Sequence, residues 1–168
     1  MKRSFFQHLI HVILRKPGLI RRFKVTKDIL GNVKNKNILD VGCGSGIYSI
    51  YFAKKGAKAT GIDFSSAMIN LANKNSRKEN CEINFINLNF LDYEERTIFD
   101  YLLFIGVFDY VDKDEIPKYF EKAINLTEKK IIATFPKKFA FQTIIRYIWL
   151  KLQNCAVYFF TKKQIKRI

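Results

Sequence analysis

The sequence predicts an α/β fold: a Rossmann-like, doubly wound sheet of about five parallel strands with helices before it. Three observations support this class. Between residues 37 and 135, short apolar runs alternate with helical patterns, which is typical of a parallel sheet with crossover helices. The run at residues 100–105 is nearly all apolar, as expected for a strand that is buried on both faces. A glycine-rich turn follows the first apolar run and precedes a helical pattern.

The predicted strands are residues 37–41, 58–62, 83–88, 100–105 and 130–135. Between them, a helix over residues 47–55 ends at Gly56, because glycine readily adopts the left-handed conformation that closes helices. Ser65 or Ser66 begins a second helix as its N-cap. Asp114 caps a third helix, whose apolar residues follow the i, i+3, i+4 spacing.

The two flanks are expected to be helical. A capping box at residues 4–7 opens a helix that runs to about residue 15, and a second helix runs from about residue 19 to 30, where Gly31 stops it. After the fifth strand no sequence remains for a C-terminal antiparallel hairpin, so we expect the chain to be truncated or naturally short. The predicted division is basic N-terminal helices (1–36), a Rossmann-like core (37–135) and a basic, aromatic C-terminal segment (136–168).

The net charge of +15 lies at the two ends of the 168-residue chain. Residues 1–36 hold ten lysines and arginines against one acid, and residues 129–168 hold ten against none, whereas the centre is slightly acidic. Such ends favour an anionic partner, which is a membrane surface, a nucleic acid or an acidic substrate.

No apolar run reaches the ~18–20 residues of a membrane-spanning helix, so we expect a cytoplasmic protein that touches a membrane at its periphery. The cysteines at positions 43, 81 and 155 have neither zinc-ligand nor disulfide-framework spacing. We predict that they are small buried apolar residues and that the chain has no metal site.

The glycine-rich turn indicates which ligand the core binds. Gly42, Gly44 and Gly46 are spaced G-x-G-x-G, whereas a dinucleotide site uses G-x-G-x-x-G and would place its third glycine where Ile47 stands. An NAD-type oxidoreductase is therefore disfavoured. Asp40, two residues before the first glycine, would repel a pyrophosphate and suits a ligand with a cationic amine.

A second acidic residue, Asp63, follows the second predicted strand. A carboxylate at that place can accept hydrogen bonds from both hydroxyls of a ribose. The next residue, Phe64, can lie against an adenine ring. S-adenosylmethionine, which has a ribose, an adenine and a cationic amino-acid tail, fits this description.

In residues 38–46, 61–65 and 99–103 the chain resembles the class I S-adenosylmethionine-dependent methyltransferases. It is more loosely similar, at residues 106–110, to the magnesium-protoporphyrin and quinone-pathway methyltransferases. The resemblance implies that Asp40 and the glycine backbone hold the methionine part and that Asp63 holds the ribose. The full set of implied cofactor contacts is Asp40, Gly42, Cys43, Gly44, Gly46, Asp63, Phe64, Asn89, Phe90 and Gly106.

Two assignments remain open on the resemblance. Asn89 takes the place of an aspartate that often reads the adenine amino group, and Asp92 is the alternative; Asn89 can also be an ordinary turn residue. Asp109 and Tyr110 are weak candidates for a general base, since transfer from a sulfonium depends mainly on proximity and orientation. The sequence therefore assigns no catalytic residue.

The loop after the fourth strand lacks the Asn/Asp-Pro-Pro-aromatic motif of enzymes that methylate amide or adenine nitrogen, and it lacks a Pro-Cys pair. We therefore expect a methyltransferase for a small, lipophilic acceptor. The alternatives are a shortened, catalytically weak protein that binds the cofactor or a partner, and an RNA methyltransferase. An exposed fifth strand would also allow dimerisation through the sheet edge.

Overall fold

The structure is a computed structural model that describes residues 16–94 and 97–135, and the chain divides into two compact units, Met1–Gly31 and Asn32–Ile168. In the first unit, helix α2 spans Lys16–Leu30. It starts three residues before the predicted position because Pro17 lies in its first turn, where a missing N–H breaks no helical hydrogen bond. Gly31 ends it as predicted, with a φ of 60°. The predicted helix at residues 4–15 and the segment 136–168 lie outside the described residues.

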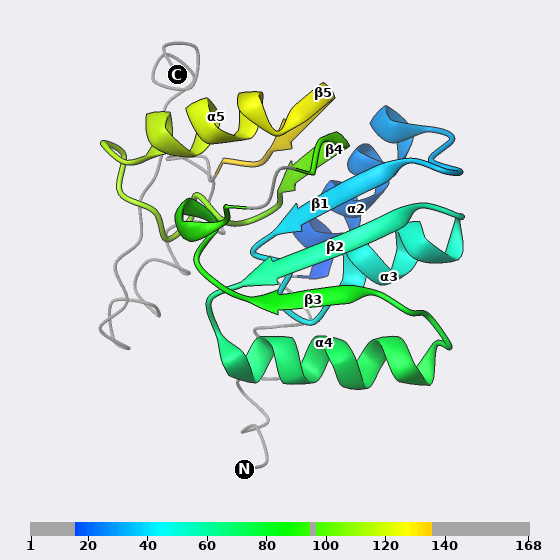
Figure 1. Cartoon of the computed structure of the whole chain (residues 1–168). Coiled ribbons are helices and arrows are strands. Elements are labelled where there is room, and N and C mark those ends of the chain that lie inside the picture. Colours follow the sequence, from blue (N-terminus) through cyan, green and yellow to red (C-terminus); the bar gives the residue numbers. More distant parts are fainter. Residues whose placement is uncertain (1–15, 95–96, 136–168) are drawn as a thin grey trace. The chain divides into compact units, whose positions relative to one another are not determined.

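The second unit is built on a sheet of five parallel strands in the order β3-β2-β1-β4-β5 (Figure 1). The predicted α/β class and strand number are thereby confirmed. The strands are β1 (Asn37–Val41), β2 (Lys58–Asp63), β3 (Asn84–Asn87), β4 (Phe99–Phe104) and β5 (Thr127–Ala133).

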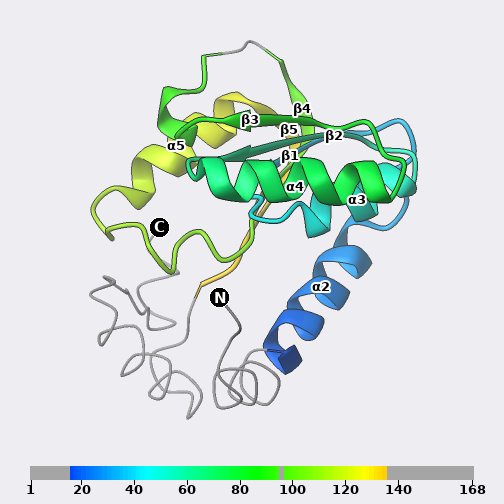
Figure 2. The same cartoon turned by 90° about the horizontal axis from the view of Figure 1, so that it is seen from below.

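The helices are α3 (Ile47–Lys54), α4 (Ser66–Lys78) and α5 (Ile116–Asn125), with a 3₁₀ turn, η2, at Phe90–Asp92. Helices α3 and α4 cover the same face of the sheet (Figure 2). The strand order reverses between β1 and β4, so right-handed crossovers place α5 on the opposite face. In the described residues no helix combines the length and apolar character needed to cross a bilayer.

The alternation of side chains along β1 sets the two halves of the core. Leu39 and Val41 belong to the large buried cluster that includes Ile116 and Tyr119 of α5. The intervening residue Asp40 points to the other face, where α3 lies. A strand that is buried on both faces therefore carries one carboxylate in an otherwise apolar run.

The predicted boundaries of β5, α5 and β3 also differ from those of the structure. Strand β5 begins three residues earlier than expected, because the first half of this outer strand is polar and mostly exposed and gives no apolar signal. Helix α5 is not capped by Asp114: Glu115 holds the N-cap position, and the Asp114 N–H bonds instead to Asp112 Oδ1 at 3.1 Å. Strand β3 covers only Asn84–Asn87, with two exposed end residues and two half-buried central residues. The predicted cap at Ser65 is confirmed, since its Oγ accepts the Met68 N–H.

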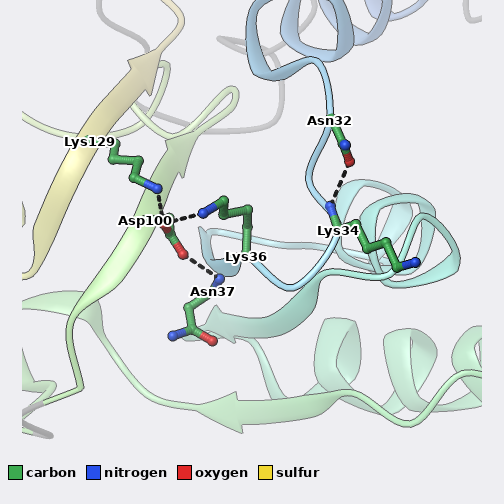
Figure 3. Close-up of polar contacts among 6 residues, drawn as sticks. All are labelled: Asn32, Lys34, Lys36, Asn37, Asp100 and Lys129. Atoms are coloured by element: carbon green, nitrogen blue, oxygen red, sulfur yellow. Dashed lines mark hydrogen bonds and ion pairs between the residues drawn. The ribbon is translucent and has the colours of Figure 1, made fainter.

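At the amino ends of the strands, one carboxylate joins three segments (Figure 3). Asp100 Oδ1 lies 2.6 Å from Lys129 Nζ on β5 and 3.4 Å from Lys36 Nζ, which precedes β1. Asp100 Oδ2 accepts the Asn37 N–H at 2.9 Å. The hydrogen bonds from Lys129 and from the Asn37 backbone lower the pKa of Asp100 to about 2.

We predict that Asp100→Asn lowers the free energy of unfolding by about 1 kcal/mol at pH 7, an amount limited by the partial exposure of both lysines. A carboxylate with a lowered pKa stabilises the fold above its unfolded-state pKa and loses that contribution as the pH falls toward 2. Urea unfolding at pH 7 and at pH 3 should therefore show a smaller difference between the variant and the wild type at the lower pH.

The matched control is Glu79→Gln, which breaks an ion pair with Lys54 in which both side chains are about half exposed. We expect a smaller change in stability for this variant than for Asp100→Asn. Equal effects of the two substitutions would mean that the Asp100 network does not link the strands energetically.

Candidate functional site

The candidate site lies at the carboxyl ends of β1 and β2, next to the point where the strand order reverses between β1 and β4. Ligands of open parallel sheets bind in the crevice outside such a switch point. The loop of residues 42–46, called here the glycine loop, joins β1 to α3 at this place. The loop of residues 105–110, called the β4 loop, follows β4 on the other side of the switch point.

All three glycines of the glycine loop have positive φ angles: 65° at Gly42, 54° at Gly44 and 79° at Gly46. Residues with a Cβ rarely adopt this conformation, so the G-x-G-x-G spacing is a backbone requirement. Two close approaches add to it. A Cβ at position 42 would lie 2.8 Å from Val107 Cγ2 in the β4 loop, and one at position 46 would lie 2.9 Å from Phe85 Cζ on β3.

Asp63, at the end of β2, ties the glycine loop to the segment after β2. Its Oδ2 accepts the Gly44 N–H at 2.9 Å, and its Oδ1 accepts the Ser65 N–H at 2.9 Å. Each carboxylate oxygen has a second lone pair. The carboxylate can therefore accept one further hydrogen bond on each oxygen, which fits a vicinal diol such as that of a ribose.

Asp40 is enclosed beneath the glycine loop, with 1% of its surface exposed. Its Oδ2 accepts the Ser49 hydroxyl of α3 at 2.7 Å. Burial raises the pKa of Asp40 to about 6, while the hydrogen bonds from the side chain and backbone of Ser49 oppose that rise and the charge of Asp63 adds to it. Asp40 can therefore act on a ligand through its charge, from below the loop.

The Cys43 thiol in the glycine loop is affected by the charges of Asp40 and Asp63. It is buried, and burial followed by the charges of Asp40 and Asp63 raises its pKa well above the usual range. The predicted burial is confirmed for Cys43 and was wrong for Cys81, which is half-buried; both are free, and Cys155 lies outside the described residues. The thiol is thus neutral, and the potential beneath the loop comes from two carboxylates, which suits a cationic ligand group.

The predicted adenine side divides into exposed and buried residues. Phe64 is 80% exposed, an unusual state for a phenylalanine and one that leaves its ring free to stack on a planar ligand. Asn89 uses Oδ1 to accept the Leu91 N–H at 3.2 Å, so it is the N-cap of η2. Phe90 is buried and lies edge-to-face with Phe104, so only its backbone can meet a ligand.

The β4 loop is held by Thr134, a residue that no sequence pattern had singled out. Gly106 has a φ of 81°, and its N–H donates to Thr134 Oγ1, just beyond β5, at 2.8 Å. The Thr134 N–H in turn bonds to the Phe104 carbonyl at 3.0 Å. Together with the contact between Val107 and Gly42, these bonds fix the β4 loop beside the glycine loop.

The two weak candidates for a general base differ in their access to solvent. Asp109 is buried, with 4% of its surface exposed, whereas Tyr110 is 49% exposed. Among the described residues no group of three or more histidine, cysteine, aspartate or glutamate side chains is arranged to hold a metal ion. Of the two candidates, only Tyr110 presents its side chain at the surface of the β4 loop.

Two asparagines complete the site and were not predicted. Asn75 Nδ2, on α4, donates to the Ser45 carbonyl in the glycine loop at 3.0 Å. Asn87 Nδ2, at the end of β3, donates to the Asp63 carbonyl at 2.9 Å. These contacts join residues 30 and 24 positions apart in the sequence, so no local pattern could have revealed them.

Residues 38–130 match the family model described as "Methyltransferase domain". Among curated proteins, a putative protein N5-glutamine methyltransferase from Methanocaldococcus jannaschii is 41% identical over 80 residues, which is 45% of this chain and 38% of that protein. A ubiquinone biosynthesis O-methyltransferase from Coxiella burnetii is 42% identical over 53 residues, or 32% of this chain and 23% of that protein. The matches thus span less than two fifths of these relatives.

Solved structures share the fold at low sequence identity. Magnesium protoporphyrin IX methyltransferase from Synechocystis, crystallised with bound SAH, matches with a TM-score of 0.78 at 19% identity, covering 99% of this chain and 76% of that one. An S-adenosylmethionine-dependent methyltransferase from Methanosarcina mazei matches with a TM-score of 0.67 at 21% identity, covering 82% and 79% of the two chains.

We predict that Gly42→Ala destabilises the protein more than Gly44→Ala. Both substitutions place a Cβ at a positive φ, which costs about 1–2 kcal/mol, but only the Cβ at position 42 meets a neighbour within 4 Å, namely Val107 Cγ2. Urea unfolding measures both differences.

The double variant Gly42→Ala/Val107→Ala removes that neighbour and should recover part of the additional loss, after correction for Val107→Ala alone. Strict additivity of the two single substitutions would contradict the contact between the glycine loop and the β4 loop.

Proposed function

The chain belongs to the methyltransferase family whose domain model it matches, the class I S-adenosylmethionine-dependent enzymes, and we propose that it transfers the methyl group of S-adenosylmethionine to a small, lipophilic acceptor. The observation that carries this proposal is the pair of carboxylates at the glycine loop. Asp63 has two unused lone pairs at the end of β2, and Asp40 lies buried under the loop. A ribose and a cationic amine are the groups that such a pair accommodates.

Within this proposal, each part of the cofactor has a place. The Asp63 carboxylate accepts hydrogen bonds from the ribose hydroxyls while it keeps those from the Gly44 and Ser65 N–H groups. The exposed ring of Phe64 stacks on the adenine, and the segment at Asn89 and Phe90 borders the adenine edge through backbone atoms and the Asn89 amide. The glycine loop, from Gly42 through Cys43 to Gly46, lies against the methionine part above Asp40.

When bound, S-adenosylmethionine supplies a methyl group on a sulfonium that an acceptor nucleophile can attack. The protein's contribution is to align the two reactants, which accounts for much of the rate in such transfers. Gly106 and Val107 hold the β4 loop at the glycine loop through Thr134 and Gly42. Tyr110 is the more accessible candidate for taking a proton from the acceptor, since Asp109 is buried.

The choice of a small, lipophilic acceptor rests on the β4 loop and its surroundings. Phe108 is buried in this loop and stacks with half-buried Phe120 and Phe135 at centroid distances of 5.5 and 5.1 Å. The names of the relatives cover several acceptors, among them a protein glutamine, ubiquinone precursors and a magnesium porphyrin. Because the β4 loop lacks the Asn/Asp-Pro-Pro-aromatic motif, the aromatic neighbourhood favours a small molecule over an amide nitrogen.

Two other functions remain as alternatives. A catalytically weak protein that binds the cofactor or a partner would keep the glycine loop and Asp63 without turnover. An RNA methyltransferase would use the basic ends of the chain for phosphate contacts. The test is incubation with methyl-labelled S-adenosylmethionine and a panel of quinone-like, porphyrin and RNA acceptors. Label in a small molecule supports the proposed function, label in RNA supports an RNA methyltransferase, and no labelled acceptor supports the binding protein.

Calorimetry tests the cofactor assignment, with S-adenosylhomocysteine as the ligand and NAD as the comparison. Binding of S-adenosylhomocysteine and not of NAD is the expected result. Absence of S-adenosylhomocysteine binding by a folded chain would overturn the proposed function.

We predict that Phe64→Ala weakens S-adenosylhomocysteine binding about 10-fold, since stacking of one base on an aromatic ring contributes ~1–3 kcal/mol. Its stability in urea should hardly change, because the ring is 80% exposed. The matched control is Ile124→Ala on α5, which is also mostly exposed and lies away from the site. Unchanged affinity in Phe64→Ala would contradict the proposed stacking of the adenine on Phe64.

The proposal includes peripheral contact with an anionic membrane by a protein of the cytoplasm. In the described residues, α2 exposes Leu19, Ile20, Val25 and Ile29 among five lysines and arginines, a composition that suits a headgroup surface. A second copy pairing with the outer strand β5 is the proposed mode of any dimer.

Co-sedimentation with liposomes tests the membrane contact. We predict that vesicles containing phosphatidylserine pellet the protein, that neutral phosphatidylcholine vesicles do so far less, and that salt weakens the binding because it screens the charges. Equally small binding to both kinds of vesicle would contradict the membrane contact and leave the methyltransferase assignment intact.

A further inference from the structure

We propose that Ser49 is a positioning residue of the cofactor site, which keeps the Asp40 carboxylate negatively charged beneath the glycine loop at neutral pH. That charge favours the cationic amine of the cofactor's amino-acid tail. The inference rests on the proposed function for its ligand, but its electrostatic part can be measured on the protein alone.

The geometry gives Ser49 an unusual double role. Gly46 is the N-cap of α3 and has no side chain with which to accept the free N–H groups of the first turn. Asp40, from the neighbouring strand β1, takes that role: it accepts the Ser49 hydroxyl at 2.7 Å and the Ser49 backbone N–H. The carboxylate therefore caps the helix, and the start of a helix favours a negative charge.

Both partners are shut off from water, with exposed fractions of 0% for Ser49 and 1% for Asp40. A buried carboxylate that loses a hydrogen-bond donor has no solvent to replace it. In the register of the sheet, Asp40 lies between Gly61 of β2 and Leu103 of β4, neither of which offers a polar side chain. The side-chain donor to Asp40 that the structure shows is the Ser49 hydroxyl.

The titratable groups that act on Asp40 oppose its ionisation. The charge of Asp63 on β2 raises the pKa of Asp40, and the neutral thiol of Cys43 offers no compensating charge. With Ser49 in place the pKa of Asp40 is about 6, so the carboxylate is mostly charged at pH 7 by a margin of only about one pH unit. Removal of the Ser49 hydroxyl should abolish that margin.

The test is the pH profile of S-adenosylhomocysteine affinity, measured by calorimetry between about pH 5.5 and 8.5, a range that spans the titration of Asp40. In the wild type we expect affinity to fall below about pH 6. In Ser49→Ala the fall should begin roughly one pH unit higher, because a hydroxyl donor to a carboxylate is lost. The variant should therefore bind about two-fold more weakly at pH 7 and about five-fold more weakly at pH 6, and it should match the wild type closely at pH 8.5.

Two further variants sharpen the result. Ser49→Thr keeps the hydroxyl and should restore the wild-type profile. Ser76→Ala is the matched control, since Ser76 is also buried but its hydroxyl donates only to the backbone carbonyl of Asn73. It should leave the profile unchanged. A loss of affinity in Ser49→Ala that is the same at every pH would reduce Ser49 to a structural residue and overturn the proposal.

A ligand-free measurement separates this proposal from the proposed function. Because the pKa of Asp40 is raised in the folded state, the protein loses stability as the pH rises toward about 6, where the carboxylate ionises. Ser49→Ala should raise this pKa further and so extend the loss of stability to higher pH. The destabilisation of Ser49→Ala relative to the wild type, measured in urea, should therefore grow between pH 5 and pH 8. A constant difference would overturn the role of Ser49 even if the cofactor binds.

If Ser49→Ala does not fold, Asp40→Asn replaces it. This variant should lose the pH dependence near pH 6, and retention of that dependence would equally overturn the proposal.

Discussion

The structure of the site depends on two carboxylates and a loop that only glycines can form. Asp63 accepts the N–H groups of Gly44 and Ser65, so the end of β2 and the turn after β1 are fixed by the same side chain. Asp40 lies one strand away, buried under that turn and capping α3. The three glycines have positive φ angles; side chains of Val107 and Phe85 pack close to Gly42 and Gly46, whereas a Cβ at Gly44 would meet nothing within 4 Å, so the backbone there is open to a ligand.

The parallel sheet makes this arrangement possible. The order β3-β2-β1-β4-β5 brings the carboxyl ends of β1, β2 and β4 together, and thus the glycine loop, Asp63 and the β4 loop. The amino ends of the strands have a stabilising role, since Asp100 links the starts of β1, β4 and β5 through Asn37, Lys36 and Lys129 (Figure 3). The candidate binding site and the stabilising Asp100 network therefore lie at opposite ends of the same strands.

Much of this could be predicted from the sequence, because the signals are local. The spacing of Gly42, Gly44 and Gly46 and the acid after the second strand indicated the cofactor, and the family match confirmed that reading. Ser49, Asn75 and Thr134 could not be predicted, since each is an ordinary polar residue whose partner is fixed only by the fold. Strand β5 began earlier than predicted for a related reason: its exposed half is polar, and its pairing with β4 is not a sequence pattern.

The central claim is that the glycine loop and Asp63 bind the cofactor, and amide NMR during titration with S-adenosylhomocysteine tests it most directly. The account predicts that the largest shifts occur at the amides of Gly42, Gly44, Gly46 and of residues 63–65, with smaller ones in the β4 loop. The amide resonances of Asn37 and Asp100, at the amino ends of β1 and β4, should not shift. Shifts that spare the glycine loop, or that centre on the amino ends of the strands, would contradict the account.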